Sequence, residues 1–280
     1  MSNHSQIASS TATDSGLPDF AQPPVDETAI SLQFPPIRGF NVPHFGLYWN
    51  RVRQDFDRFE IQQPITNLIE TFGPPVKKRR PSIEMLELPE IRCWILDHTG
   101  NRLVQVQRDR FVHNWRKVVG NETYPRYPIL RESLLKEWTR FCEFLRDEGL
   151  APPEVNQCEV TYVNNIECNK GWNGYGELDK VIATLATPKA NTFLPGPERV
   201  NMQAIYRLPD DAGRLYIAFV PVIRGRDGVE VLQMTLTARG APKSPSVEDV
   251  FSWIDLGRKW VVRGFADFTT PEMHSVWEKQ

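Results

Sequence analysis

The sequence lacks the features that would place it in or across a membrane. No stretch approaches the roughly 18 consecutive apolar residues of a membrane-spanning helix. The first residues also lack the basic region and the apolar core of a secretory signal peptide. Cysteine is scarce, at 4 of 280 residues, and no CxxC pair occurs, which argues against a zinc site and a disulfide framework. We therefore expect a cytoplasmic protein with reduced thiols, without membrane contact and without a metal.

Motifs for the common reaction classes are missing as well. There is no GxSxG serine elbow, no GxxxxGK or GxGxxG phosphate loop and no HExxH metal motif. His113 lies near Asp109, which would orient a general base, but a surface or packing histidine is the favoured interpretation. The sequence therefore predicts no catalytic residue and no cofactor, and an enzyme is the less favoured class.

The composition is that of an ordinary globular protein. Hydrophobic residues make up 40% and charged residues 24%, and 280 residues suffice for one large domain or two ordinary ones. The net charge of -2 argues against a globally basic nucleic-acid binder.

The first half predicts strands and helices in the order β-α-β-β-α-β. Residues 1–22 are rich in Ser, Thr, Ala and Asn and are expected to form a disordered tail. Apolar residues then recur with strand or helix periodicity. This order is typical of a ferredoxin-like sheet with helices on one face. The predicted elements of residues 23–168 are strand 30–34, helix 42–59, an exposed connection 62–88, strands 91–96 and 103–110, helix 130–145 and strand 158–163.

The second half, residues 194–280, predicts a β-meander covered by a long helix. It follows a glycine-punctuated loop over residues 169–193. Three strands are expected over 200–208, 215–223 and 229–238. Ser246 with Asp249 three residues later predicts the start of the long C-terminal helix. The predicted fold class is therefore α+β, with a mostly antiparallel sheet in two halves that form either two domains or one continuous domain.

Several segments together resemble a known family. PPVDE before the first strand, QRDRFVHNW, YPRYP, VTYVNNIE and the ending GFADFTTPEMHSVWEK are similar to segments of a sporadically distributed, functionally uncharacterised bacterial family of about this length. The resemblance runs from Pro23 to the C-terminus. It implies no catalytic assignment, and the patchy occurrence of the family implies accessory genes, such as those of defence or mobile-element systems.

Two groups of residues are candidate binding sites. The first combines positive charge with an aromatic ring and suits a polyanion or another ligand. The favoured alternative is that Phe111 and Trp115 are core or strand-end anchors and that the arginines pair with nearby carboxylates. The second is the loop pair Trp172 and Tyr175, for which packing onto the sheet is again the favoured alternative. The short basic run Lys77–Arg80 is expected to be a solvated loop. The first group consists of Arg108, Arg110, Asn114, Trp115, Arg116 and Lys117.

These observations predict a non-catalytic interaction or accessory protein with a protein partner. The alternative is a ligand- or nucleic-acid-binding module that uses either a pocket between sheet and helix or the basic cluster. Nucleic acid is the less favoured partner because the net charge is slightly negative.

Overall fold

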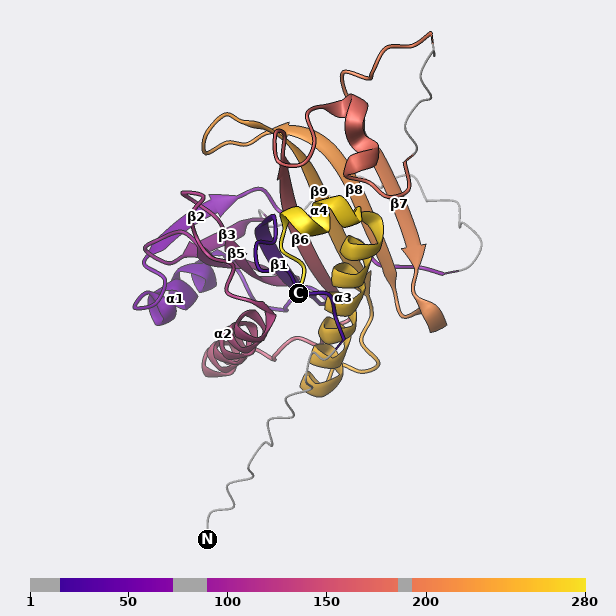
Figure 1. Ribbon diagram of the computed structural model, residues 1–280. Coiled ribbons are helices and arrows are strands. Elements are labelled where there is room, and N and C mark those ends of the chain that lie inside the picture. Colours follow the sequence, from indigo (N-terminus) through magenta and orange to yellow (C-terminus); the bar gives the residue numbers. More distant parts are fainter. Residues whose placement is uncertain (1–15, 73–89, 186–192) are drawn as a thin grey trace.

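A nine-stranded antiparallel sheet forms the body of the protein (Figure 1). The computed structural model describes residues 16–72, 90–185 and 193–280. The strand order is β2-β3-β4-β5-β1-β6-β9-β8-β7. The strands are β1 (Val25–Gln33), β2 (Arg58–Gln62), β3 (Arg92–Leu96), β4 (Arg102–Gln107), β5 (Arg110–Arg116), β6 (Gln157–Glu167), β7 (Met202–Arg207), β8 (Arg214–Ile223) and β9 (Glu230–Gly240).

Helices cover one face of this sheet. In Figure 1, α1, α2 and α3 lie in a layer in front of it; α2 contacts β5, and α3 crosses β6, β9 and β8. No helix of the described ranges is both long and apolar enough to cross a membrane. The α-helices are α1 (Val42–Val52), α2 (Tyr127–Asp147), α3 (Val247–Phe268) and α4 (Pro271–Val276), and two short 3₁₀ helices are η1 (Tyr175–Lys180) and η2 (Pro209–Asp211).

The α+β class, the antiparallel sheet and the long C-terminal helix are confirmed, but the order of elements in the first half differs. The observed order is β1-α1-β2-β3-β4-β5-α2-β6, so the expected β-α-β-β-α-β order is wrong. The expected strand 103–110 is two strands, β4 and β5, joined by a turn at Arg108 and Asp109. This turn contains neither Gly nor Pro, the residues that usually mark a turn. The predicted helix 42–59 ends at Val52, and β2 follows it.

The two predicted halves share the sheet. β1 pairs with β5 on one side and with β6 on the other, and β6 pairs with β9 of the C-terminal meander. The predicted loop 169–193 contains η1, and its residues 186–192 lie outside the described residues, as does the basic run Lys77–Arg80.

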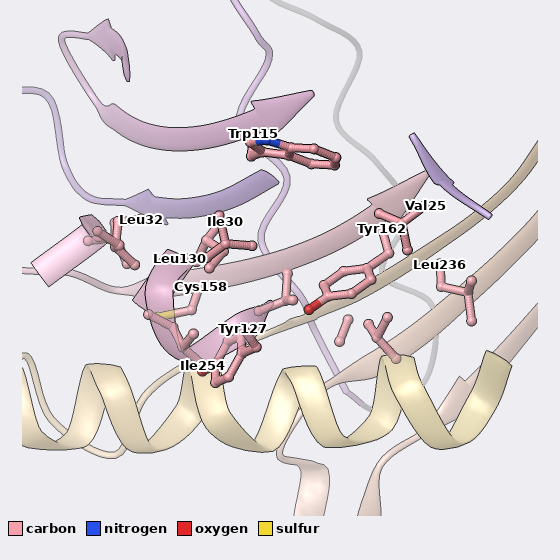
Figure 2. Packing of buried hydrophobic residues seen from close by; sticks show 14 of the residues in the cluster. Val25, Ile30, Leu32, Trp115, Tyr127, Leu130, Cys158, Tyr162, Leu236 and Ile254 are labelled. Atoms are coloured by element: carbon pink, nitrogen blue, oxygen red, sulfur yellow. The ribbon is translucent and has the colours of Figure 1, made fainter. Parts of the chain in front are cut away.

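The core lies between the sheet and the helix layer. Trp138 of α2 is 5% exposed and packs against Phe34 and Phe111, with ring centroids 5.8 and 5.5 Å away. On α3, Gly257 permits a close approach to the sheet, because a Cβ there would lie 3.2 Å from Cγ2 of Val160 in β6. Figure 2 shows side chains of the sheet and of α3 meeting in this layer.

The two ends of the described chain lie side by side. Ala21 N donates to Glu278 O (3.0 Å), and Gln280 N donates to Asp19 O (2.9 Å). Phe20 is 5% exposed and packs against Phe265 and Trp277. Residues 19–22, which the composition assigned to a disordered tail, are therefore held by backbone hydrogen bonds and by the buried Phe20. A single phenylalanine is too weak a pattern to reveal this. The first 15 residues of the predicted tail lie outside the described residues.

Candidate ligand-binding cavity

A cavity of about 360 Å³ lies between the helix-facing side of the sheet, the start of α2, the middle of α3 and the segment before β1. Its wall has a large apolar part, with a few polar side chains and two arginines. In Figure 2, Tyr162 reaches from the sheet toward the helix layer, and Val25 and Leu236 lie near it. The lining residues come from five separate segments: Leu17–Phe20 with Pro23 and Val25, Tyr124 with Arg126–Pro128, Tyr162 with Asn164, Leu236, and Arg258 with Val261, Val262 and Phe265.

Proline sets the backbone at the start of α2. Tyr124 precedes Pro125, and a residue before proline is disfavoured in the helical region. Helix α2 begins with Pro128 in its first turn, where the missing N–H of proline costs nothing. The segment YPRYP therefore ends the preceding loop and places two tyrosines and one arginine along one side of the cavity.

Two tyrosine hydroxyls meet in the wall of the cavity. The hydroxyls of Tyr124 and Tyr162 are 2.8 Å apart, and the Tyr124 ring also packs against Trp115, with centroids 5.6 Å apart. Burial raises the pKa of Tyr124 well above its usual value, and the neighbouring Tyr162 raises it further. The hydroxyl of Tyr124 therefore keeps its proton at neutral pH.

Tyr127 joins α2 to α3 at the side of the cavity. Its hydroxyl donates to Asp255 of α3, which also accepts two hydrogen bonds from Arg131 (2.8 and 3.1 Å). Burial, followed by the charge of Asp255, raises the pKa of Tyr127 well above its usual value. This network fixes the distance between the two helices and thereby the width of the cavity.

Arg126 has a strained backbone. Its φ of 71° and ψ of 154° lie in a region that is adopted almost only by glycine, at a cost of about 1–3 kcal/mol. Its guanidinium donates to Asp19 Oδ1 (2.7 Å) and to Phe20 O (3.0 Å) and lies 6.0 Å from the centre of the Tyr124 ring. Such strain persists where the surroundings impose it, and it concentrates at functional sites.

A second arginine approaches the cavity from α3. The guanidinium carbon of Arg258 lies 4.9 Å from the centre of the Tyr127 ring. The charges of Arg258 and Arg126 both act on Tyr124 and lower its pKa, against the larger effect of burial. Each of the two cations therefore lies near one tyrosine ring of the cavity wall, Arg126 near Tyr124 and Arg258 near Tyr127.

The predicted basic cluster does not form one surface. Arg110 and Asn114 point to the sheet face opposite the helices, whereas Trp115 is on the helix-facing side and 5% exposed. Arg116 donates to Gly100 O (3.1 Å) and lies over the Trp94 ring. Arg108 is half-buried in the turn that precedes β5.

Arg110 is held inside the fold. It is 5% exposed and donates to Ser31 Oγ (3.2 Å), Gln33 Oε1 (2.8 Å) and Asn67 Oδ1 (3.2 Å). Its Nε is buried and has no hydrogen-bond partner among the described residues. Asn114, 2% exposed, donates to Glu27 Oε1 (2.7 Å). Arg110 is therefore held by neutral hydroxyl and amide groups rather than by the carboxylates that were expected as its partners.

Lys117 lines a second cavity, of about 340 Å³, which also borders the start of β1 and shares Pro23 with the first cavity. Most charges there are paired: Arg226 with Asp26 (2.6 Å), and Arg224 and Lys170 with Glu167 (2.6 and 2.7 Å). Burial lowers the pKa of Lys117. The first cavity is the better candidate site, because it combines an apolar wall with few charges.

The predicted loop contacts pack against their own loop. Trp172 is 1% exposed, and its Nε1 donates to Glu167 O (2.9 Å). The Tyr175 ring lies 5.8 Å from the Trp172 ring, and its hydroxyl donates to Glu230 Oε1 (3.0 Å). Neither residue lines either of the two cavities.

Sequence patterns did not reveal the cavity residues Tyr124, Arg126, Tyr162 and Arg258. The segment YPRYP was considered as part of the family resemblance and not as a site, although two tyrosines around an arginine are an unusual composition for a turn. Within the described ranges, no three His, Cys, Asp or Glu side chains gather as a metal site.

Comparisons with known proteins identify no relative: no protein-family profile, curated protein or solved structure matches this chain.

Proposed function

We propose that this protein is a non-catalytic binding protein that holds a small, mostly apolar molecule in the cavity between the sheet, α2 and α3. The cavity of about 360 Å³ carries the proposal. Ligand sites are typically hollows of roughly 300–1,000 Å³, with mainly apolar walls and a few well-placed polar groups. The cavity has this size and this mixture of side chains.

The chemistry of the wall supports binding rather than catalysis. Tyr124 and Tyr127 have pKa values raised well above the ordinary value by burial, so neither can act as a base at neutral pH. Asp255 is already bound by Tyr127 and Arg131. The polar groups therefore orient a ligand through hydrogen bonds.

Neutral anilinonaphthalene, whose fluorescence rises in apolar surroundings, tests the proposal. We expect the wild-type protein to bind it with one site per chain. Val262, a partly exposed residue of the wall, offers a blocking variant, because Val262→Trp places an indole in the cavity. Ser252→Trp on the exposed side of the same helix is the matched control.

Val262→Trp should reduce probe binding at least tenfold, and Ser252→Trp should leave it unchanged. Melting temperatures of both variants show whether the fold is retained. Equal binding by the wild-type protein and a folded Val262→Trp variant would contradict the proposal.

A second candidate function is association with a protein partner through the edge strand β7. The strand lies at the end of the sheet and exposes Ile205 (54%) and Tyr206 (42%); exposed edge strands can pair with an added strand. Replacing Ile205 with Lys should then abolish capture of a defined partner from the native host and leave probe binding intact. Undiminished capture would contradict this candidate.

A further inference from the structure

We propose that the ligand of the cavity is an apolar carboxylic acid whose carboxylate is bound by Arg126 and Arg258. This inference rests on the proposed function and specifies the chemistry of the ligand. It uses the charge of the wall, the position of the two arginines and the conformation of Arg126.

The described residues that line the cavity include two arginines, Arg126 and Arg258, and one carboxylate, Asp19. An anionic group is therefore the polar end of a ligand that suits this wall. The planar guanidinium also matches the two oxygens of a carboxylate.

The two arginines approach the same part of the cavity from different elements. Arg126 comes from the turn before α2 and lies near the Tyr124 ring, and Arg258 comes from α3 and lies over the Tyr127 ring. Burial keeps the hydroxyl of Tyr124 protonated. A carboxylate at this point would face two cations and a phenol, and its hydrocarbon part would face Val25, Leu236, Val261 and Phe265.

The backbone of Arg126 indicates that its side chain has a function. Glycine would adopt φ 71°, ψ 154° without strain. An arginine at this position therefore reduces stability, and a direct role in binding explains its presence.

Asp19 competes for Arg126. Its carboxylate lies 2.7 Å from Arg126 Nη1, and both side chains are partly exposed at the mouth of the cavity. The ion pair therefore positions the guanidinium, and the carboxylate of the ligand displaces Asp19 when it binds. Because of this competition, removing the charge of Arg126 should weaken the binding of an anion, whereas removing the charge of Asp19 should strengthen it.

Two probes with the same body separate this inference from the proposed function. Anilinonaphthalene is neutral, and anilinonaphthalene sulfonate has one negative charge. The wild-type protein should bind the sulfonate at least tenfold more tightly than the neutral probe, because one charge-assisted hydrogen bond contributes about that factor.

Substitutions at the mouth provide the decisive comparison. Arg126→Gln should weaken sulfonate binding about tenfold and leave neutral-probe binding unchanged. Asp19→Asn should strengthen sulfonate binding, because it removes the competing carboxylate and keeps an oxygen that accepts from Phe20 N (2.9 Å). A purely structural ion pair predicts that both variants weaken both probes.

Decanoate and decyl phosphate, as competitors of the sulfonate, test the ligand class. Decanoate should compete more strongly. Tighter binding of decyl phosphate would overturn the carboxylate assignment, and equal binding of both naphthalene probes would overturn the role of the arginines while leaving the proposed function in place. If neither naphthalene probe binds a protein with an unchanged melting temperature, both the proposed function and this inference are wrong.

Discussion

The two faces of the sheet use arginine in different ways. On the face opposite the helices, Arg110 is 5% exposed and donates to three side chains of the fold. On the helix-facing side, Arg126 and Arg258 border a cavity of about 360 Å³. A guanidinium surrounded by acceptors of its own chain contributes to structure, whereas we propose that the two guanidiniums beside the first cavity contact its ligand. The comparison therefore predicts large stability effects on the first face and large binding effects on the second.

Arg110→Ala should have the largest effect on stability. It leaves the buried acceptors of Ser31 and Gln33 without their donor, so we expect a loss of about 3 kcal/mol in the free energy of unfolding. Arg108→Ala, two residues earlier in a half-buried turn, is the control and should cost less than about 1 kcal/mol. Urea denaturation of both variants measures the difference, and equal losses would remove the distinction between the faces.

Phe20→Ala should weaken the contact between the ends of the chain. The ring is 5% exposed and lies against Phe265 and Trp277, so its removal should cost about 3 kcal/mol. A disordered tail over residues 1–22, as the composition predicted, would make a protein starting at Pro23 as stable as the full chain. The packed structure instead predicts a lower melting temperature for that truncation, and an unchanged value would contradict it.

Arg126→Gly should stabilise the protein. Glycine removes strain of about 1–3 kcal/mol, and the loss of a partly exposed ion pair with Asp19 costs less than about 1 kcal/mol. The net expectation is a gain of about 1 kcal/mol together with weaker binding of the anionic probe. Lower stability with unchanged binding would show that Arg126 is a structural residue.

Two separate carboxyl groups, those of Glu27 and Glu122, provide the smallest predicted effects on stability. Burial raises the pKa of Glu27, against a hydrogen bond from Asn114. Its protonated form is therefore favoured in the folded state, and its contribution to stability decreases as the pH rises through the unfolded and then the folded pKa. Glu27→Gln should accordingly stabilise the protein at neutral pH, by less than about 1 kcal/mol.

Glu122 should show the opposite sign. Burial opposes ionisation, but hydrogen bonds from the backbone of Val119 and Gly120 and from the Asn101 side chain outweigh it and hold the pKa well below the usual value. The stabilising contribution is present above the unfolded pKa and is lost as the pH falls. Glu122→Gln should therefore destabilise the protein at neutral pH and have less effect in acid. Unfolding curves of Glu27→Gln and Glu122→Gln at pH 4 and pH 7 measure the two effects. The account is contradicted if both variants change the free energy of unfolding in the same direction at both pH values.

Local patterns in the sequence were sufficient for the long elements. The apolar stripe around Trp138 predicted α2, and Ser246 predicted the start of α3, where Asp249 N donates to the Ser246 hydroxyl (3.2 Å). Strand β5 was missed because no glycine or proline separates it from β4. Its alternation also places Arg110 and Asn114 on one face and Trp115 on the other, which divides the group that was interpreted as a basic cluster.

Local sequence patterns could not predict the cavity, for a different reason. Its lining comes from five segments, from Leu17 to Phe265, and no periodicity connects segments that meet only in the folded chain. A pocket between sheet and helix was among the expected alternatives, but its residues were not identifiable. The strained backbone of Arg126 was equally invisible, since conformation follows from tertiary contacts rather than from composition.

An NMR measurement of distances between bound anilinonaphthalene sulfonate and the protein tests the central claim most directly. The account predicts nuclear Overhauser contacts from the naphthalene protons to the methyl groups of Leu236 and Val261 and to the ring of Tyr162. Contacts to these residues that disappear in Val262→Trp and persist in Ser252→Trp would support a ligand site in the cavity. Contacts only to other parts of the surface would contradict it.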